Sequence, residues 1–356
     1  MPKFIPSVKR LTEERNQVKV QDIIPQVSDK DRLKLGLSLA KEKRLDEALD
    51  EFKAVLQNNS SSIPAHMGAG TVYLRQKRYD EAMNHFQSAV KLDPLMSKAA
   101  LKVGRIYFIK GELDKAAEEF QNALNLDPKS TQAYVAMGQV FMKQKNYEAA
   151  IKQISKALRL NPQLAKARLL VAQIYKAQGK IPEAIAILKS VIAIDPKLFL
   201  PYLLIGRLHL IQKEYSAAKE AFQEIITKEL PTPAANLAKL LGFTEALIGV
   251  NELEEATQIL RNLPEVDATA AKKHQLFGDI FYNQGLFRQA TEEYQAAKLL
   301  ASKQENALNE IDDFDILIEL DDAHWEELAS TYRASGKNLL SDPSNPESQQ
   351  RRISSL

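Results

Sequence analysis

The residue types that most often carry catalysis or metal binding are sparse in this chain. Its five histidines have no second histidine and no patterned carboxylate at the spacing that metal ligands need. The absence of cysteine excludes disulfides, thiolate zinc sites and cysteine nucleophiles. No glycine-rich phosphate loop and no serine-nucleophile motif is present. We therefore expect no catalytic residue, no metal and no cofactor, and a protein that is not an enzyme. The histidines are His66, His85, His209, His274 and His324.

A second candidate for chemistry is an acidic stretch near the end of the sequence. Residues 305–327 contain ten acidic residues and no Lys or Arg, although the whole chain has a net charge of +2. The rest of the chain is therefore strongly basic. Within 305–321, acids alternate with apolar residues around Asp312, Asp313, Phe314 and Asp315. Such alternation is typical of binding segments. It leaves open a solvated linker, a motif for an external partner, and a plug for the protein's own binding surface.

These residues are positioned by a sequence period of 34, seen most clearly in the window 97–130. Ala116 in this window has counterparts at Ala82 and Ala150, 34 residues away on either side. A fixed period of this length is typical of a helical repeat array. Apolar spacing predicts two helices per unit, with Gly111 as the stop of the first. Since neither helix can bury its apolar face alone, we expect the units to stack.

The unit resembles the tetratricopeptide repeat, in the form found in bacterial scaffolds with many such repeats. The family's pattern of bulky, small and aromatic residues falls on Val103, Gly104, Tyr107, Ala116, Phe120, Ala123 and Pro128. Only Ala100 departs clearly, because the family has a bulky residue there. The resemblance implies an all-α fold, a right-handed superhelical solenoid of about eight helix–turn–helix repeats with a C-terminal capping helix.

The repeat pattern also predicts how the chain is divided. The eight repeats are expected at 29–62, 63–96, 97–130, 131–164, 165–198, 199–232, 237–270 and 271–304. Residues 1–28 are expected to be a flexible arm, with a docked N-terminal cap as the alternative. Residues 233–236 are interpreted as an insertion, and Pro264 is expected to shorten the second helix of its repeat. After 305–321, we expect a capping helix at 322–340 that places Trp325 on the last repeat, and a disordered tail at 341–356.

The resemblance also implies a binding site, because first helices of this family line a concave groove. The positions that face the groove are occupied by Arg75, Lys98, Leu101, Arg105, Phe108, Val135, Gln139, Met142, Lys143, Lys166, Leu169, Gln173, Lys176, Leu203 and Arg207. Together they indicate a basic groove with apolar pockets, suited to an acidic peptide or helix. Glu245 and Asp279 change the sign in the last two repeats. The alternative is that these are ordinary solvated helix faces.

We therefore predict a protein–protein interaction scaffold or adaptor, acting in the assembly or regulation of a larger complex. The alternative function is a nucleic-acid-associated regulator that uses the same basic face. Most Tyr and Phe residues fall at packing positions, which leaves few for base stacking. The sequence shows neither a signal-peptide core nor an apolar stretch long enough to span a bilayer. We expect a cytoplasmic location.

Overall fold

The structure is a computed structural model that describes residues 28–264 and 267–303. Within these residues the chain forms sixteen α-helices and no strand. The chain divides into two compact units, 1–136 and 137–356, and the division falls within one helix, α8 (Thr131–Lys143). The predictions made for the N-terminal arm, for the acidic segment 305–321, for the capping helix 322–340 and for the tail concern residues outside this description.

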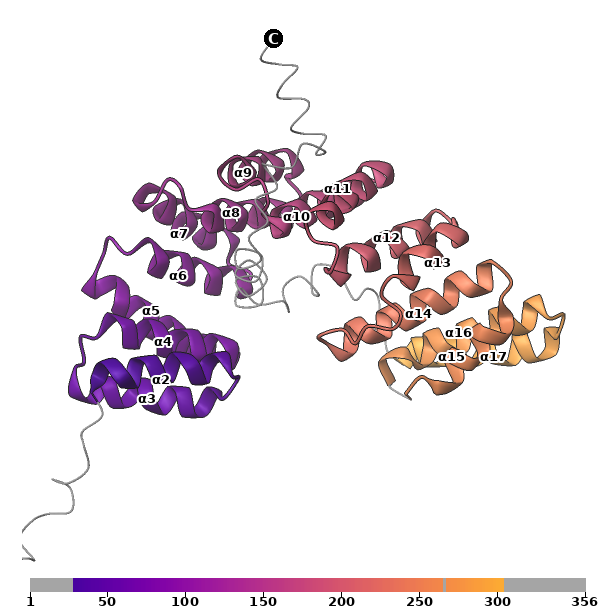
Figure 1. Cartoon of the computed structure of the whole chain (residues 1–356), viewed down its shortest axis with the longest axis horizontal. Helices are drawn as coiled ribbons and strands as arrows, with labels where there is room; N and C mark the ends of the chain where they lie inside the picture. The colour runs from indigo at the N-terminus through magenta and orange to yellow at the C-terminus, as the bar shows by residue number, and fades with distance from the viewer. Residues whose placement is uncertain (1–27, 265–266, 304–356) are drawn as a thin grey trace, which may run out of the picture. The chain divides into compact units, whose positions relative to one another are not determined.

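The first unit is built from successive helix pairs (Figure 1). Its helices are α2 (Asp29–Lys41), α3 (Leu45–Asn58), α4 (Ile63–Arg75), α5 (Tyr79–Leu92), α6 (Ser97–Ile109), α7 (Leu113–Leu126) and the beginning of α8. Within each pair the two helices pack against each other. The second helix of a pair then packs on the first helix of the next, α3 on α4 and α5 on α6.

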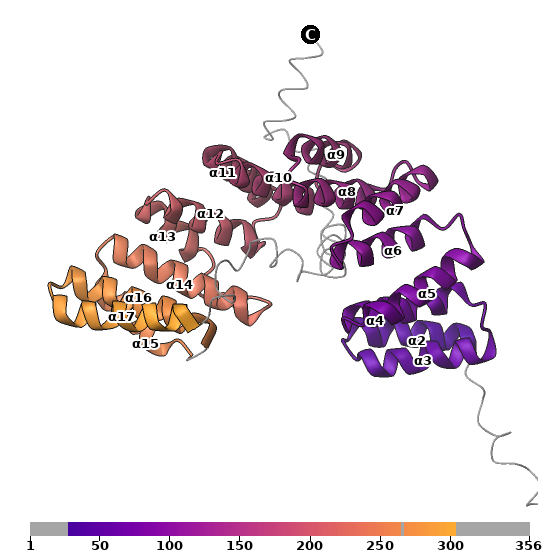
Figure 2. The same cartoon turned by 180° about the vertical axis from the view of Figure 1, so that it is seen from behind.

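The second unit continues the same scheme (Figure 2). Its helices after α8 are α9 (Tyr147–Leu160), α10 (Ala165–Ala177), α11 (Ile181–Ile194), α12 (Phe199–Ile211), α13 (Tyr215–Gln223), α14 (Pro233–Gly249), α15 (Leu253–Asn262), α16 (Asp267–Asn283) and α17 (Phe287–Lys303). First helices also meet one another here, α12 with α14 and α14 with α16. The predicted all-α repeat solenoid is confirmed in the described residues.

The change of register near residue 233 has a different form from the predicted insertion. Residues 233–236 are the first turn of α14, which is 17 residues long, whereas α13 is only nine. Thr232 caps α14, because its Oγ1 accepts a hydrogen bond from the Ala235 N–H at 3.1 Å. Pro233 fits the first turn, where a missing N–H costs nothing. As predicted, α15 ends at Asn262, just before Pro264.

Each helix pair is closed by a small residue on the first helix opposite a large one on the second. A Cβ atom added to Gly104 of α6 would lie 2.7 Å from Phe120 Cε1 of α7, closer than side chains can pack. The same contact recurs in other pairs, where the residues are Gly36 and Phe52, Gly70 and Phe86, Gly206 and Phe222, and Gly278 and Tyr294. In α10 and α11 the equivalent positions hold Ala172 and Leu188, so a larger first residue comes with a smaller second one.

The turn inside each pair depends on one residue in the left-handed conformation. After α6 this residue is Gly111, whose φ is +78°, and the next N–H, that of Glu112, donates to the Tyr107 carbonyl at 2.9 Å. This is the hydrogen bonding of a Schellman motif, and the predicted helix stop is confirmed. The equivalent residues with positive φ are Lys43, Lys77, Lys145, Gly179, Lys213, Asn251 and Gly285. Five of the eight turns therefore carry a residue with a Cβ atom where glycine is less strained.

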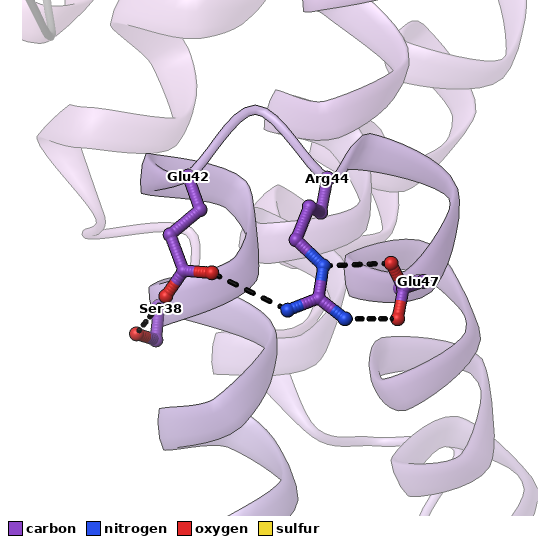
Figure 3. Close-up of polar contacts among 4 residues, drawn as sticks. All are labelled: Ser38, Glu42, Arg44 and Glu47. Carbon is purple, nitrogen blue, oxygen red and sulfur yellow. Dashed lines mark hydrogen bonds and ion pairs between the residues drawn. The ribbon is translucent and has the colours of Figure 1, made fainter.

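Side chains beside these turns add exposed ion pairs, as Figure 3 shows for the first pair of helices. Arg44 donates from Nε to Glu47 at 2.7 Å and reaches Glu42 at the end of α2 from Nη1 at 3.4 Å. The hydrogen bonds from Arg44 hold the pKa of Glu47 below its usual range. Because both partners are exposed, we expect these pairs to orient the turn and to contribute little stability.

The last described helix pair leaves an apolar face uncovered. Phe52 is completely buried because the next first helix closes over it: a Cβ atom on Gly68 of α4 would lie 2.5 Å from its ring. The equivalent Tyr294 of α17 is 37% exposed, and the nearby Phe287 is 61% exposed. The structure therefore presents on α16 and α17 the kind of face that a further first helix covers in the other repeats.

The pairing of glycine with phenylalanine predicts a compensating mutation. We expect Gly104→Ala to destabilise the protein by about 1–3 kcal/mol through overpacking against Phe120. The double variant Gly104→Ala/Phe120→Leu copies the α10–α11 contact and should lose less stability than the sum of the single variants. Urea unfolding followed by circular dichroism measures all three. Strict additivity would show that the two residues do not constrain each other.

The turns predict stabilising substitutions. Lys77→Gly and Lys145→Gly should each stabilise the protein by about 1 kcal/mol, because glycine adopts positive φ without the Cβ clash. Lys152 is an exposed lysine in the interior of α9 and serves as the matched control. Lys152→Gly should destabilise by about 1 kcal/mol. A loss of thermal stability in the turn variants similar to that of the control would contradict this account.

The uncovered face of α16 and α17 predicts the place of the segment 322–340. We expect this segment to pack there as a capping helix with Trp325, the only tryptophan of the chain, shielded from water. The fluorescence of the native protein should then be blue-shifted, and Phe287→Glu should move it towards the emission of the unfolded chain. A water-like emission maximum in the native wild-type protein would exclude the cap.

Candidate functional site

Charge is segregated between the two helices of the inner pairs. The first helices α4, α6, α8, α10 and α12, here called the acid-free helices, contain no Asp or Glu. Their basic residues are Arg75, Lys98, Lys102, Arg105, Lys143, Lys166, Arg168, Lys176 and Arg207. The second helices α5, α7, α9 and α11 carry acids in their first turn, where the helix dipole favours negative charge. Each acid-free helix therefore adds only positive charge to the surface.

In the first unit, the predicted site residues gather mainly on α6. Lys98, Leu101, Arg105 and Phe108 follow one another at intervals of three and four residues, so they share one face of the helix. Lys98 is exposed and the other three are half-buried, which leaves parts of their side chains accessible. Val135 of α8, in contrast, is buried.

Arg75 of α4 has a structural partner. Its Nη1 donates to the Ala40 carbonyl in the last turn of α2 at 2.6 Å. Carbonyls at a helix end lack intrahelical partners and attract positive charge. This predicted groove residue therefore joins two neighbouring repeats of the first unit, whatever else it contacts.

In the second unit, the predicted residues lie on α8, α10 and α12. Lys166, Gln173 and Lys176 share one face of α10, and Arg207 lies on α12. Lys143 is exposed, and Gln139, Met142, Lys166, Lys176 and Arg207 are half-buried.

Three apolar residues predicted to form pockets are placed differently by the structure. Leu169 and Leu203 are completely enclosed, and Val135 is nearly so. A fully enclosed side chain offers a partner no surface to contact. These three residues belong to the packing between helices, because α10 and α12 bury several faces at once. The accessible apolar part of the predicted groove is therefore limited to Leu101, Phe108 and Met142.

Gln173 is unusual among the residues of the second unit. Its side chain is 8% exposed, and neither its amide nitrogen nor its amide oxygen has a hydrogen-bond partner in the structure. A buried polar group without a partner costs about 1–3 kcal/mol. The primary amide offers a donor and an acceptor, the complement of one peptide group. Gln173 is thus a site where a peptide main chain would satisfy an existing deficit.

The two acids that change the sign in the last repeats both have partners. Glu245 of α14 forms an ion pair with Lys272 of α16 at 2.9 Å. Asp279 of α16 accepts a hydrogen bond from the Tyr294 hydroxyl at 2.8 Å. Burial raises the pKa of Asp279. Burial and the bond to Asp279 together raise the pKa of Tyr294 to about 12.

Sequence reasoning missed a recurring polar contact inside the repeats. Arg32 and Glu51, His66 and His85, and His274 and Glu293 are three pairs whose members are 19 residues apart, and each pair joins the two helices of one repeat. The common separation within the 34-residue period was the signal that could have identified them. In the described ranges no group of three or more His, Asp or Glu residues is placed to hold a metal ion. None of the described helices is long and apolar enough to cross a membrane.

Solved structures share the fold at low sequence identity. A tetratricopeptide repeat protein from Parabacteroides merdae is 18% identical, with a TM-score of 0.52 over 76% of this chain and 98% of that one. Pseudomonas aeruginosa PilF is 17% identical, with a TM-score of 0.49 over 59% of this chain and 95% of that one. The tetratricopeptide protein TTC0263 of Thermus thermophilus is 21% identical, with a TM-score of 0.44 over 53% of this chain and 98% of that one.

Sequence comparison gives the family. A search of curated protein sequences finds no match. The family model described as the tetratricopeptide repeat protein 21 N-terminal ARM repeat matches residues 32–219, more than half of the chain. This range begins in α2 and ends in α13, and it includes all the acid-free helices. The chain therefore belongs to the tetratricopeptide repeat protein 21 N-terminal ARM repeat family and is a repeat protein of the tetratricopeptide type.

Proposed function

We propose that this protein is an interaction scaffold whose acid-free helices bind an acidic segment of a partner protein. The observation that carries the proposal is the charge of these helices, which hold nine Lys or Arg residues and no acid. A surface of one sign attracts a ligand of the opposite sign and speeds the encounter. The proposal includes no covalent step and no cofactor.

The side chains between the charges indicate the form of the partner. Leu101 and Phe108 stand beside Lys98 and Arg105 on α6, and Met142 precedes Lys143 on α8. A segment with alternating acidic and apolar residues complements both kinds of contact. The amide of Gln173 would pair with the main chain of an extended peptide. These features favour a peptide over a folded domain with a rigid surface.

The chain itself contains a segment of this chemistry, and we propose that residues 305–321 compete for the basic face of α10 and α12. The segment starts shortly after α17, in the same unit as these two helices. Seventeen extended residues reach at most about 60 Å. A tether of this length gives an effective concentration in the millimolar range, so a weak contact would still be substantially occupied. In this arrangement Asp312, Asp313 and Asp315 would meet Lys166, Lys176 and Arg207.

A fluorescent peptide copying residues 305–321 tests the binding face directly. We expect it to bind the full chain, and Lys166→Glu/Arg207→Glu to weaken binding by about tenfold or more, with smaller differences at high salt. The matched control is Lys152→Glu/Lys189→Glu, which reverses two exposed charges on the second helices α9 and α11. Equal weakening by the control would show only a general effect of net charge and would contradict the proposed site.

Two further arms separate the remaining alternatives. Replacing Asp312, Asp313 and Asp315 by Asn in the protein should tighten binding of the added wild-type peptide if the internal segment competes. Unchanged binding would remove the competition and leave the scaffold function intact. An oligonucleotide of similar length should bind more weakly than the peptide. Tighter, steeply salt-dependent oligonucleotide binding would instead support a nucleic-acid-associated regulator.

A further inference from the structure

Two histidines face each other inside the second helix pair of the first unit. The Nδ1 atoms of His66 in α4 and His85 in α5 are 3.0 Å apart, which is a hydrogen-bond distance. His66 also places its Nε2 atom 3.0 Å from the Ser60 carbonyl. On the other side of the contact, the His85 ring stacks on Tyr73, with ring centroids 5.4 Å apart. Both imidazoles are half-buried.

The Ser60 carbonyl decides which nitrogen carries a proton. A carbonyl oxygen can only accept, so Nε2 of His66 must be the donor in this contact. Neutral His66 then has a lone pair on Nδ1, and His85 must donate its own Nδ1 proton to it. The hydrogen bond between the rings therefore requires one proton between the two nitrogens. A second proton would place two N–H groups against each other.

The other repeats show what this pair replaces. At the same two positions, α2 and α3 join Arg32 to Glu51 at 3.0 Å, and α16 and α17 join His274 to Glu293 at 2.5 Å. Each of these contacts unites a base with an acid and is strengthened when the base is protonated. The α4–α5 pair has two bases at these positions, so protonation acts on it in the opposite direction.

We infer that His66 and His85 form a proton-sensitive joint, which holds α4 against α5 near neutral pH and releases them when both rings are protonated. The joint acts on the helix that carries Arg75, the residue that ties α4 to α2. Acidification would therefore loosen the first unit at its second repeat, while the repeats with base–acid pairs keep their contacts.

The surroundings act in the same direction. Burial is the main cause that lowers the pKa of His85, and His66 and Lys53 of α3 lower it further. Arg78 lies over the other ring system, 4.6 Å from the centre of Tyr73, and is paired with Glu81. Neither α2 nor α6, which also pack against this helix pair, contributes a group that shifts His85.

The sign of the pH effect follows from linkage. The pKa of His85 is lower in the folded than in the unfolded chain, so the unfolded chain binds more protons as the pH falls. The contribution of this contact is therefore complete above the unfolded pKa of about 6.5 and declines as the pH falls towards the folded value. Two adjacent imidazole nitrogens could alternatively hold a transition metal ion. The positive charge of Lys53 opposes that alternative.

Hydrogen exchange of the full chain tests the joint, with α16 and α17 as the internal control. Between about pH 7.5 and pH 5, protection in α4 and α5 should fall by about tenfold more than in α16 and α17, which corresponds to about one proton-linked pKa unit. His85→Glu recreates the base–acid pair of the other repeats and should remove the difference. His66→Arg/His85→Glu, which copies Arg32 and Glu51, serves if the single variant folds poorly.

Three results would overturn the inference. The first is an equal loss of protection in both helix pairs of the wild-type protein. The second is a pH-dependent loss in α4 and α5 that persists in His85→Glu and in the double variant. The third is a rise in the thermal stability of the wild type, but not of His85→Glu, on adding Zn²⁺, since this would make the two histidines a metal site.

Discussion

The close approach of two helices within each pair is the contact on which the rest of the structure depends. Glycine or alanine on the first helix leaves room for a large side chain from the second, as Gly104 does for Phe120. Neither helix can bury its apolar face alone, so the pair must form as a unit. The turn with one left-handed residue is the connection that brings the helices back against each other. Repeating this contact produces the array without a separate central core.

This packing also determines where function can lie. Each helix pair uses its apolar faces to hold its own partner and the neighbouring repeat, so charged residues are confined to the remaining surface. Acids gather at the start of the second helices, where the backbone amides and the dipole stabilise them. The acid-free helices then present basic side chains with few apolar neighbours. A scaffold of this kind can change its ligand by changing surface charge, with no change in the residues that close the pairs.

Polar contacts inside the pairs tolerate more variety than the apolar ones. The same two positions hold Arg32 with Glu51, His66 with His85, and His274 with Glu293, while the surrounding helix pairs keep one geometry. Half-buried side chains at the edge of the contact can exchange one hydrogen bond for another at small cost in packing. Such positions are therefore where a repeat can acquire its own response to pH without altering the fold.

The sequence by itself determined the features that depend on local spacing. The period of 34 predicted the helix pairs, Gly111 predicted a left-handed helix end, and Pro264 predicted the end of α15. The basic character of the first helices was also readable, because it requires only residue type and helical position. Only the tertiary structure decided that Leu169 and Leu203 are enclosed, because a helix face becomes buried through its neighbours and not through its own periodicity. It likewise decided that residues 233–236 extend α14, and that His66 meets His85, since both depend on how distant segments pack.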